Sequence, residues 1–552
     1  MRAIPLFLTA FLLGSTVACD LAKTDFDTGP ADVDDDIDED ADEDAEESGG
    51  DGGDGGDGGD GGDGGDGGDG GDGGDGGDGG GPSGDNDGDG YSTAGGDCDD
   101  NDRHTYPGAD ETCDDSDNDC DGVVDEDPKD GTASWLDDDG DGFGDAMTYD
   151  VRCDEGVSNG ADCDDTDPTE PHYVVDGASG AADGSFMRPW ATIQDGIDNA
   201  RECVAVEAGT YNENVDFGGR DVMVTGIGGT GETIIDGRNN GPAVTFASGE
   251  GIGAQLSGFT LTGGSGFEEE TSSSYSCGSG DTCTDYYITY CGGGLYIDGS
   301  TPSLSDLAIA DNAVIAPSDT SSGDDTWTYM SYGGGVCVRN ASVTLSGATI
   351  SGNSAEEGAG VFVESTGSIS LEQSELVANL GESGGAIQVD GGSLSLENVL
   401  VAWNEADIAG GGVYVVDGST TVTNATIGGN EGSTGGGLYV SGGTAVVENT
   451  IISDNVGVGV LVSGGTFNGT YNNVTGNSSD YSGTTDPTGS SGNLSSDPAF
   501  AAVSNDGNPN NDDWSLTPLS PSKDAGNPAP AHNDADGTQN DQGAYGGPNG
   551  DW

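Results

Sequence analysis

A repeat of about 25 residues in the second half of the chain constrains its fold more than any other feature. In each copy two apolar residues are separated by one residue, whose side chain would point to the opposite face of a strand. A stretch rich in glycine precedes them. After a first step of 41 residues, the spacings between copies are 25, 26, 26, 25 and 22 residues. The pairs are Leu295/Ile297, Val336/Val338, Val361/Val363, Ile387/Val389, Val413/Val415, Leu438/Val440 and Val460/Val462.

Asparagines recur with the same period, at Asn312, Asn353, Asn379, Asn404, Asn430, Asn455 and Asn477. Asparagine tolerates left-handed corners, and stacked amides can hydrogen-bond from one copy to the next. Short strands with Gly and Asn corners at this period predict a parallel β-solenoid with coils about 4.8 Å apart. A propeller blade would need about 40 residues, and a leucine-rich repeat would contain helix.

The repeats ATISGNSAEEGAGVFV, GGAIQV and GGGVYV resemble right-handed parallel β-helices of the pectin-lyase superfamily and repeats of polymorphic outer-membrane proteins. The segment DGSFMRPWATIQDGIDNA is similar to the N-terminal cap of that superfamily. The resemblance implies an all-β chain with a capped right-handed parallel β-helix over residues 173–485 and a C-terminal cap segment over 486–552. Function does not follow from this fold.

An acidic region, residues 84–172, precedes the repeats and holds three loops of the form Asp-x-Asp-x-Asp-Gly. Alternate carboxylates converge on one point and suit Ca²⁺, a cation that prefers oxygen ligands. No glutamate occupies the twelfth position of any loop, so other acids must complete the sites. The predicted ligands are Asp85, Asp87, Asp89, Asp97, Asp99, Asp117, Asp119, Asp121, Asp125, Asp137, Asp139, Asp141, Asp145, Asp162 and Asp164.

Residues 84–127 resemble the MopE-type metal-binding motif of bacterial surface proteins, and 137–171 looks like a partial second copy. That family name implies copper, for which His104, His172 and Trp135 are the nearby candidates. Copper prefers imidazole or sulfur ligands, whereas this region is mostly carboxylate. Calcium is therefore the predicted cofactor, with copper as the alternative.

The N-terminus reads as an export signal over residues 1–18, followed by Cys19 in a context that resembles a bacterial lipoprotein box. Lipidation of Cys19 would anchor the protein in the cell envelope, at the outer membrane or cell surface, with secretion as the alternative. Residues 19–83 are dominated by acids and Asp-Gly-Gly triplets, which predicts a disordered tether. Ten cysteines remain, five on each side of residue 173, so complete pairing requires a bridge between the two modules.

The formal charge of −93 excludes nucleic-acid binding through a basic surface. It also disfavours polyuronate substrates, since the repeats have no Lys or Arg from 340 to 522. A polysaccharide-degrading enzyme remains an alternative function. Its candidate catalytic acids are Glu356, Glu382 and Asp407, each three residues past a repeat asparagine.

Two insertions, at about 263–291 and 313–332, interrupt the repeats just before the glycines of a coil. Long loops on a rigid scaffold often carry binding residues, and Tyr and Trp suit sugar faces or protein contacts. The predicted ligand-binding residues are Tyr286, Tyr287, Trp327 and Tyr329. The alternative is that the aromatic residues pack the insertions onto the coils. We therefore expect a monomeric, calcium-binding surface protein that binds a glycan or a cell-surface or matrix partner.

Overall fold

The computed structural model describes residues 84–145, 148–153, 156–278, 281–322, 325–504, 509–550 and 552. The predicted signal peptide, Cys19 and the tether to residue 83 lie outside these residues. Within the described part of the chain, no helix is both long and apolar enough to cross a membrane.

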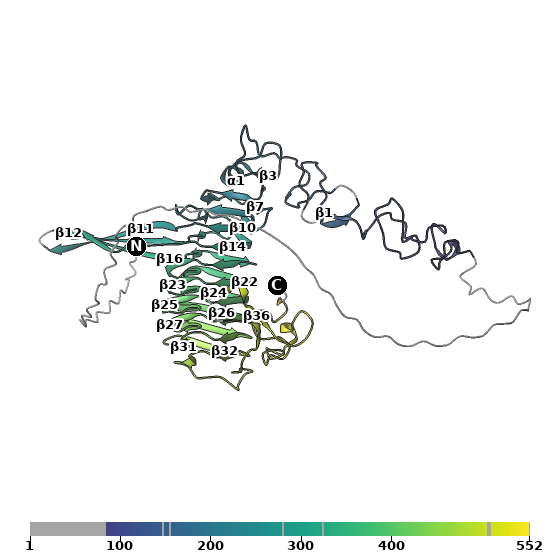
Figure 1. Ribbon diagram of the computed structural model, residues 1–552. Coiled ribbons are helices and arrows are strands. Elements are labelled where there is room, and N and C mark those ends of the chain that lie inside the picture. The colour runs from purple at the N-terminus through teal and green to yellow at the C-terminus, as the bar shows by residue number, and fades with distance from the viewer. Residues whose placement is uncertain are drawn as a thin grey trace, which may run out of the picture. The chain divides into compact units, whose positions relative to one another are not determined.

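The repeats form a parallel β-helix whose strands stack coil upon coil (Figure 1). Each coil begins with a strand, and most of these strands carry one apolar pair. These strands are β6 (Val215–Asp216), β9 (Val244–Phe246), β13 (Leu295–Asp298), β17 (Val336–Arg339), β21 (Val361–Glu364), β24 (Ile387–Ala402), β26 (Val413–Gly428), β28 (Leu438–Val440), β31 (Val458–Val462) and β34 (Ser479–Ser482).

The next strands in the coil continue into the same sheet, and β24 and β26 run through the turn unbroken. They are β3 (His172–Val174), β4 (Cys203–Val206), β5 (Gly209–Tyr211), β7 (Met223–Gly226), β8 (Thr233–Asp236), β10 (Gln255–Thr262), β14 (Ser303–Ala310), β18 (Ser342–Ser346), β19 (Thr349–Ser351), β22 (Ser368–Val377), β29 (Thr444–Glu448), β30 (Ile451–Ser453), β32 (Thr466–Thr470) and β33 (Asn473–Thr475).

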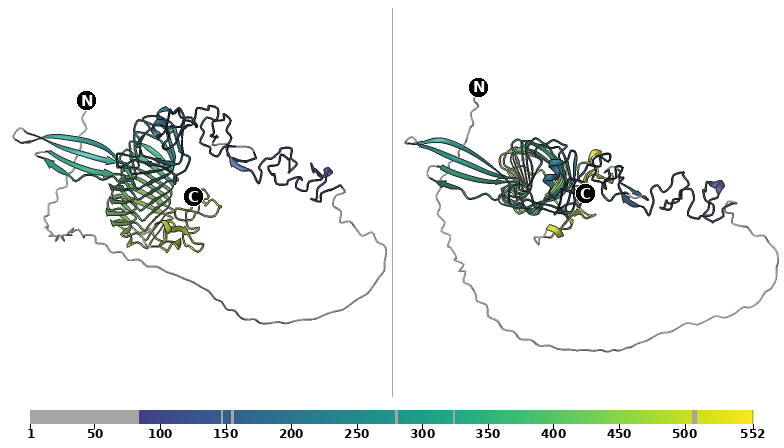
Figure 2. Two further views of the ribbon diagram at one scale, coloured as in Figure 1. Left: turned by 45° about the horizontal axis from the view of Figure 1, so that its top comes forward. Right: turned by 90° about the horizontal axis from the view of Figure 1, so that it is seen from above.

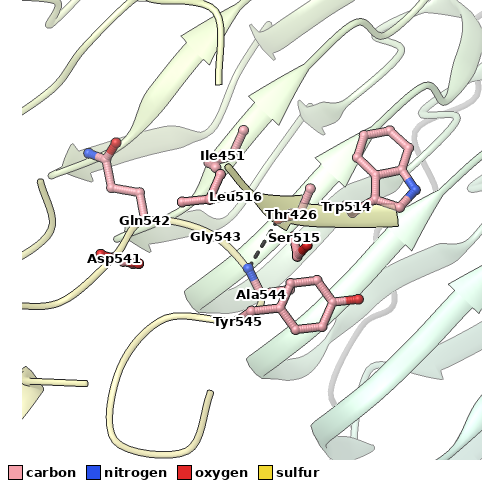
Figure 3. Close-up of a pocket in the computed structure, with 10 residues that line it drawn as sticks. All are labelled: Thr426, Ile451, Trp514, Ser515, Leu516, Asp541, Gln542, Gly543, Ala544 and Tyr545. Atoms are coloured by element: carbon pink, nitrogen blue, oxygen red, sulfur yellow. Dashed lines mark hydrogen bonds between the residues drawn. The ribbon is translucent and has the colours of Figure 1, made fainter. Parts of the chain in front are cut away.

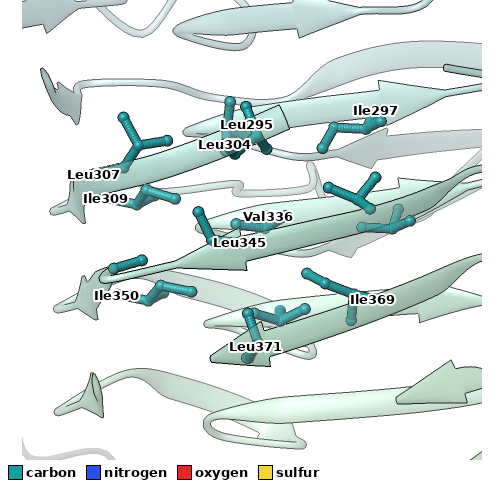
Figure 4. Close-up of a cluster of buried hydrophobic side chains, with 14 of the residues drawn as sticks. Leu295, Ile297, Leu304, Leu307, Ile309, Val336, Leu345, Ile350, Ile369 and Leu371 are labelled. Atoms are coloured by element: carbon teal, nitrogen blue, oxygen red, sulfur yellow. The ribbon is translucent and has the colours of Figure 1, made fainter. Parts of the chain in front are cut away.

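The register confirms the predicted solenoid. Val336 pairs with Val361, Val361 with Ile387, and the alignment continues through Val413, Leu438 and Val460. These side chains point inward and are fully buried in one continuous core (Figure 4). Because no coil can bury its apolar face alone, stacking supplies most of the stability.

The asparagines form the predicted ladder at the turn that precedes the third face of the coil. In each step the side-chain Oδ1 of one asparagine accepts the backbone N–H and the Nδ2–H of the asparagine before it. In the four steps from Asn312 to Asn430, the distance from the donor nitrogen to Oδ1 is 2.9–3.0 Å. The amides of Asn312 through Asn430 have no exposure, so the ladder satisfies polar groups that water cannot reach.

The third face of the coil forms a second sheet, and the insertions extend it into an arm (Figure 2). The arm consists of the antiparallel pair β11 (Phe267–Gly278) and β12 (Asp281–Cys291), then β16 (Asp325–Tyr332), which runs parallel to β12 and pairs with β15 (Thr320–Ser322). The coil strands of this sheet are β20 (Ser354–Glu357), β23 (Leu380–Ser383), β25 (Glu405–Ala409) and β27 (Glu431–Thr434).

The first coils are covered by α1 (Ile193–Asn199), whose Thr192 side chain caps the N-terminus by accepting the N–H of Asp195. Ile193 and Ile197 are fully buried and join the core of the coils. The helix therefore closes the open end of the solenoid where a further coil would otherwise be needed.

The acidic region contains little regular structure, namely η1 (Thr93–Gly95), β1 (Thr132–Ser134) and β2 (Asp150–Arg152). Disulfides Cys98–Cys120 and Cys113–Cys153 hold it, and Cys163–Cys203 joins it to β4. Cys277–Cys283 and Cys291–Cys337 lie in and beside the arm, so every described cysteine is paired. The expected bridge between the two modules is confirmed.

The segment predicted as a C-terminal cap touches the last coil through Leu494 and then lies along the side of earlier coils. It includes β35 (Phe500–Ala502), η3 (Pro509–Asn511), β36 (Asp513–Leu516) and η4 (Pro530–His532). Asn398 Nδ2 donates to the carbonyls of Ala544 and Gly546, and the N–H of Ala544 donates to Thr426 Oγ1 over 3.0 Å (Figure 3). A cavity of about 170 Å³ remains between the segment and the coils.

Candidate metal centres and binding surfaces

The first acidic loop is wound so that its carboxylates face one another. Asp85 accepts the N–H groups of Gly88 and Gly90, and Asp89 accepts the N–H of Tyr91 at 2.7 Å. Gly90 has φ 106°, a left-handed angle that allows the chain to turn around the loop centre. One oxygen from each of Asp85, Asp87 and Asp89 lies within 4.8 Å of the others.

A fourth carboxylate, the predicted ligand Asp97, lies near enough to this cluster to interact with the charges of Asp89 and Asp87. Its side chain is 2% exposed. The Oδ2 atoms of Asp87, Asp89 and Asp97 are buried and have no hydrogen-bond partner in the described structure. Burial, together with the charges of Asp89 and Asp87, raises the pKa of Asp97. The three unpaired oxygens thus belong to side chains close enough for their charges to interact.

The third loop repeats this geometry with Asp137, Asp139, Asp141 and a distant donor, Asp162. One oxygen from each of the three loop residues lies within 4.8 Å of the others. Asp162 is 3% exposed, and its Oδ2, like that of Asp139, is buried without a partner. The first and third loops also make equivalent hydrogen bonds to a distant aspartate: Asn86 N–H donates to Asp100, and Asp138 N–H donates to Asp165.

In the third cluster, burial and mutual repulsion disfavour the ionised form of the carboxylates. Burial raises the pKa of Asp141 to about 7, with a further contribution from the charge of Asp139. Burial likewise raises the pKa of Asp162 to about 6, again with a contribution from Asp139. Without a cation, these acids repel one another in a site that water solvates poorly.

The second loop uses glutamates that sequence reasoning did not select. Glu111 Oε1 accepts the N–H of Asp119 at 2.6 Å, and its oxygen groups with those of Asp117 and Asp119. Glu126 groups with Asp119 and Asp121, and both of its side-chain oxygens are buried without a partner. Glu126 is the tenth residue of this loop, so an acid near the loop's end was the signal that could have identified it.

The remaining predicted ligands pair with other residues of the acidic region. Asp99 accepts the N–H of Asn101, and Asp164 accepts the hydroxyl of Thr166, so each binds the chain just downstream. Asp125 Oδ1 accepts the N–H of Asp114. The backbone of Asp145 pairs with that of Asp162 and brings Asp162 to the third loop.

The residues considered for copper take part in other contacts. His172 is half-buried, and its Nδ1 accepts the indole N–H of Trp190 at 3.1 Å. Burial lowers the pKa of His172. The ring of Trp135 lies 4.9 Å from that of Tyr149. The three clusters described above consist of carboxylates alone, a donor set that suits a hard cation better than copper.

The predicted aromatic residues of the arm divide between its two faces. Tyr286 pairs with Trp327 and Ile288 with Tyr329, so these side chains share one face. The rings of Tyr286 and Trp327 stack with centroids 5.1 Å apart and planes at 4°. Tyr287 lies on the opposite face and is 42% exposed. A single site therefore cannot use all four predicted residues.

Other aromatic residues attach the arm to the coils, as the alternative interpretation expected. Phe267 of β11 stacks on Tyr296, and Tyr332 of β16 lies against Phe362, each with centroids 4.6 Å apart. Tyr296 and Phe362 are 2% and 4% exposed. The Cys291–Cys337 disulfide lies in the same cluster. The arm is thus fixed to the solenoid at its base.

The predicted acid column is only partly aligned. The pairing of β20 with β23 places Glu356 beside Glu382, whereas the register of β23 and β25 shifts between Ala406 and Ala409, where Asp407 lies. Glu382 and Asp407 are exposed, and Glu356 accepts the N–H of Ser331. The neighbouring Glu357 is more enclosed: it accepts Gln388 Nε2–H at 2.6 Å, and burial raises its pKa.

Comparison with known families identifies two parts of the chain. Residues 334–498 match the family "Right handed beta helix region", which assigns the hand of the coils. Residues 97–126 and 162–171 match the family "Putative metal-binding motif", and these stretches contain Asp97, Glu126 and Asp162. No curated protein matches the chain. Among solved structures, the chain is similar to a pectate lyase, Pel9A, at 12% identity and a TM-score of 0.38, covering 68% of this chain and 95% of that one.

Proposed function

We propose that the acidic module binds Ca²⁺ at its three loops. The observation that carries this proposal is the set of buried, unpaired carboxylate oxygens on Asp87, Asp89, Asp97, Glu126, Asp139 and Asp162. A carboxylate oxygen that is buried without a hydrogen-bond partner is unfavourable. A divalent cation among these oxygens would remove that cost.

The donor chemistry supports calcium over copper. Ca²⁺ takes six to eight oxygen ligands in flexible geometry, and aspartates at positions 1, 3 and 5 of a loop provide such ligands. Asp85, Asp87, Asp89 and Asp97 offer this set at the first site, and Asp137, Asp139, Asp141 and Asp162 at the third. Glu111 and Glu126 enlarge the set at the second.

Replacing the distant donor of one site should remove that site alone. We expect Asp97→Asn and Asp162→Asn each to weaken one class of Ca²⁺ site by about tenfold or more, since each loses a charged ligand without a change of size. Isothermal titration calorimetry on the exported, oxidised protein measures the affinity and stoichiometry.

Asp138→Asn is the matched control, because Asp138 lies in the third loop but is exposed. It should leave the affinity within about twofold. Equal losses of Ca²⁺ affinity from Asp138→Asn and Asp162→Asn would mean that the loops attract cations only as a diffuse acidic surface. Tighter binding of Cu²⁺ than Ca²⁺ at the same sites would favour the copper alternative.

The proposal further places the protein at the bacterial cell envelope, attached to a membrane through a lipid on Cys19. The β-helix would then stand beyond a long acidic segment and present the arm to the surroundings. A rigid arm carrying half-exposed aromatic side chains suits recognition of a glycan or of a cell-surface or matrix partner.

The stacked Tyr286 and Trp327 support binding through one face of the arm. If that face binds a glycan, Tyr286→Ala with Trp327→Ala should weaken binding on a glycan array by about tenfold or more, since each ring supplies a broad apolar surface. Tyr287→Ala, on the opposite face of the same strand, should have little effect. A loss caused by Tyr287→Ala alone would assign binding to the other face.

The same experiment distinguishes the enzyme alternative. Release of shorter oligosaccharides that Glu382→Gln abolishes, with binding retained, would assign catalysis to Glu382. Binding without product release supports a binding protein.

A further inference from the structure

A groove lies between the side of the coils and the C-terminal segment, and it shares no residue with the metal loops or the arm. Its volume is about 870 Å³. On the coil side it is lined by Trp403, Glu405, Glu431 and Asp454, and on the other side by Asp497 and Phe500. Its size falls in the range of pockets that hold small organic ligands.

Trp403 occupies an unusual position in this groove. It lies at the corner residue just before the asparagine ladder, where the chain takes a left-handed turn in successive coils. The other corner residues that line the groove are Ala378, Gly429, Asp454 and Gly476, whereas Trp403 holds φ 57° with a large side chain. A bulky residue at positive φ is a strained outlier, and such strain persists mainly where a side chain is needed in place.

The surroundings fix the indole ring. Gly429 on the next coil leaves room for it, since a Cβ there would lie 2.7 Å from the ring carbons. The indole N–H donates to Asp512 Oδ2 at 2.7 Å, and Asp512 Oδ1 accepts the N–H of Ser504 on the opposite wall at 2.7 Å. Trp514 contacts the ring with a centroid distance of 5.8 Å. Trp403 thus forms a preorganised, half-buried platform that joins both walls.

The charged side chains that line the groove are all carboxylates. Glu405 and Glu431 are paired across adjacent coils and are exposed to the groove, as are Asp454 and Asp497. The described lining contains no Lys, Arg or His. Carboxylates beside an aromatic platform accept hydrogen bonds from hydroxyl groups, while their charge repels an anionic ligand.

We propose that this groove binds a neutral oligosaccharide, with Trp403 stacking on a sugar ring and Glu405 and Glu431 accepting its hydroxyl hydrogens. The corners from Ala378 to Gly476 span four coil steps, about 19 Å at a spacing of about 4.8 Å. The groove therefore suits a short stretch of a chain rather than one sugar. The site adds to the proposed glycan function and does not depend on the arm.

The test measures binding of cellohexaose, maltohexaose, xylohexaose and mannohexaose to the full chain by calorimetry, with hexagalacturonate as the anionic counterpart. We expect at least one neutral hexaose to bind and hexagalacturonate to bind at least about tenfold more weakly. Trp403→Gly should weaken binding by about tenfold or more. Because glycine adopts positive φ without strain, this variant should keep a cooperative thermal transition.

Glu431→Ala provides a second variant that cannot disturb the core, since its side chain is exposed, and it should weaken binding several-fold. Tyr439→Ala is the control, a half-exposed aromatic residue outside the groove. This variant should bind as the unaltered protein does. The proposal is wrong if no neutral hexaose binds, if hexagalacturonate binds equally well, or if Trp403→Gly and Glu431→Ala both retain full affinity.

Discussion

Chelation of calcium from the full-length protein is expected to open residues 84–172 to hydrogen exchange while the coils from 295 to 475 stay protected. This module carries 31 Asp and Glu against three Lys and Arg, and few of its side chains enter an apolar core. Binding to the folded form alone stabilises it by about 2.7 kcal/mol per site when free Ca²⁺ is 100 times Kd. Three such sites would dominate the stability of a module this small.

Hydrogen exchange followed by mass spectrometry, with and without EDTA, measures this effect, and the coils serve as an internal control. Protection of the acidic module should fall by about a hundredfold for each site that loses its cation. The disulfides will limit expansion but cannot replace the missing charge compensation. Exchange in residues 84–172 that is indifferent to both EDTA and added Ca²⁺ would contradict the calcium proposal.

Asn404→Ala is expected to cost about 3–5 kcal/mol of unfolding free energy, because it breaks the asparagine ladder in the middle of the solenoid. Asn404 Nδ2 donates to Leu376 O, Ala402 O and Asn430 Oδ1, and its Oδ1 accepts both the backbone and side-chain N–H groups of Asn379. All of these groups are buried. Removing the Asn404 amide therefore leaves several buried donors and acceptors without a hydrogen-bond partner.

Chemical denaturation followed by circular dichroism measures this loss as a lower midpoint. Asn468→Ala is the matched control, since Asn468 is exposed on β32 and should change the stability by less than about 0.5 kcal/mol. Similar midpoints for Asn404→Ala and Asn468→Ala would mean that the ladder is not a source of stability.

The sequence by itself determined the features that repeat at a fixed spacing. The pairs from Leu295/Ile297 to Val460/Val462 and the asparagine ladder follow from a period of about 25 residues, because each coil contacts only its neighbours. The aspartates at positions 1, 3 and 5 of each acidic loop were likewise evident, since a short loop brings them together whatever surrounds it.

Only the tertiary structure decided which distant groups meet. Local spacing could not pair Cys163 with Cys203 or set Tyr286 against Trp327, because these contacts depend on how separate segments align. The groove at Trp403 requires a C-terminal segment more than 90 residues away to lie beside the coil, and Asp512 bonds to the indole only there. Periodicity specifies contacts between neighbouring coils, whereas the chain must fold before its non-repeating segments have partners.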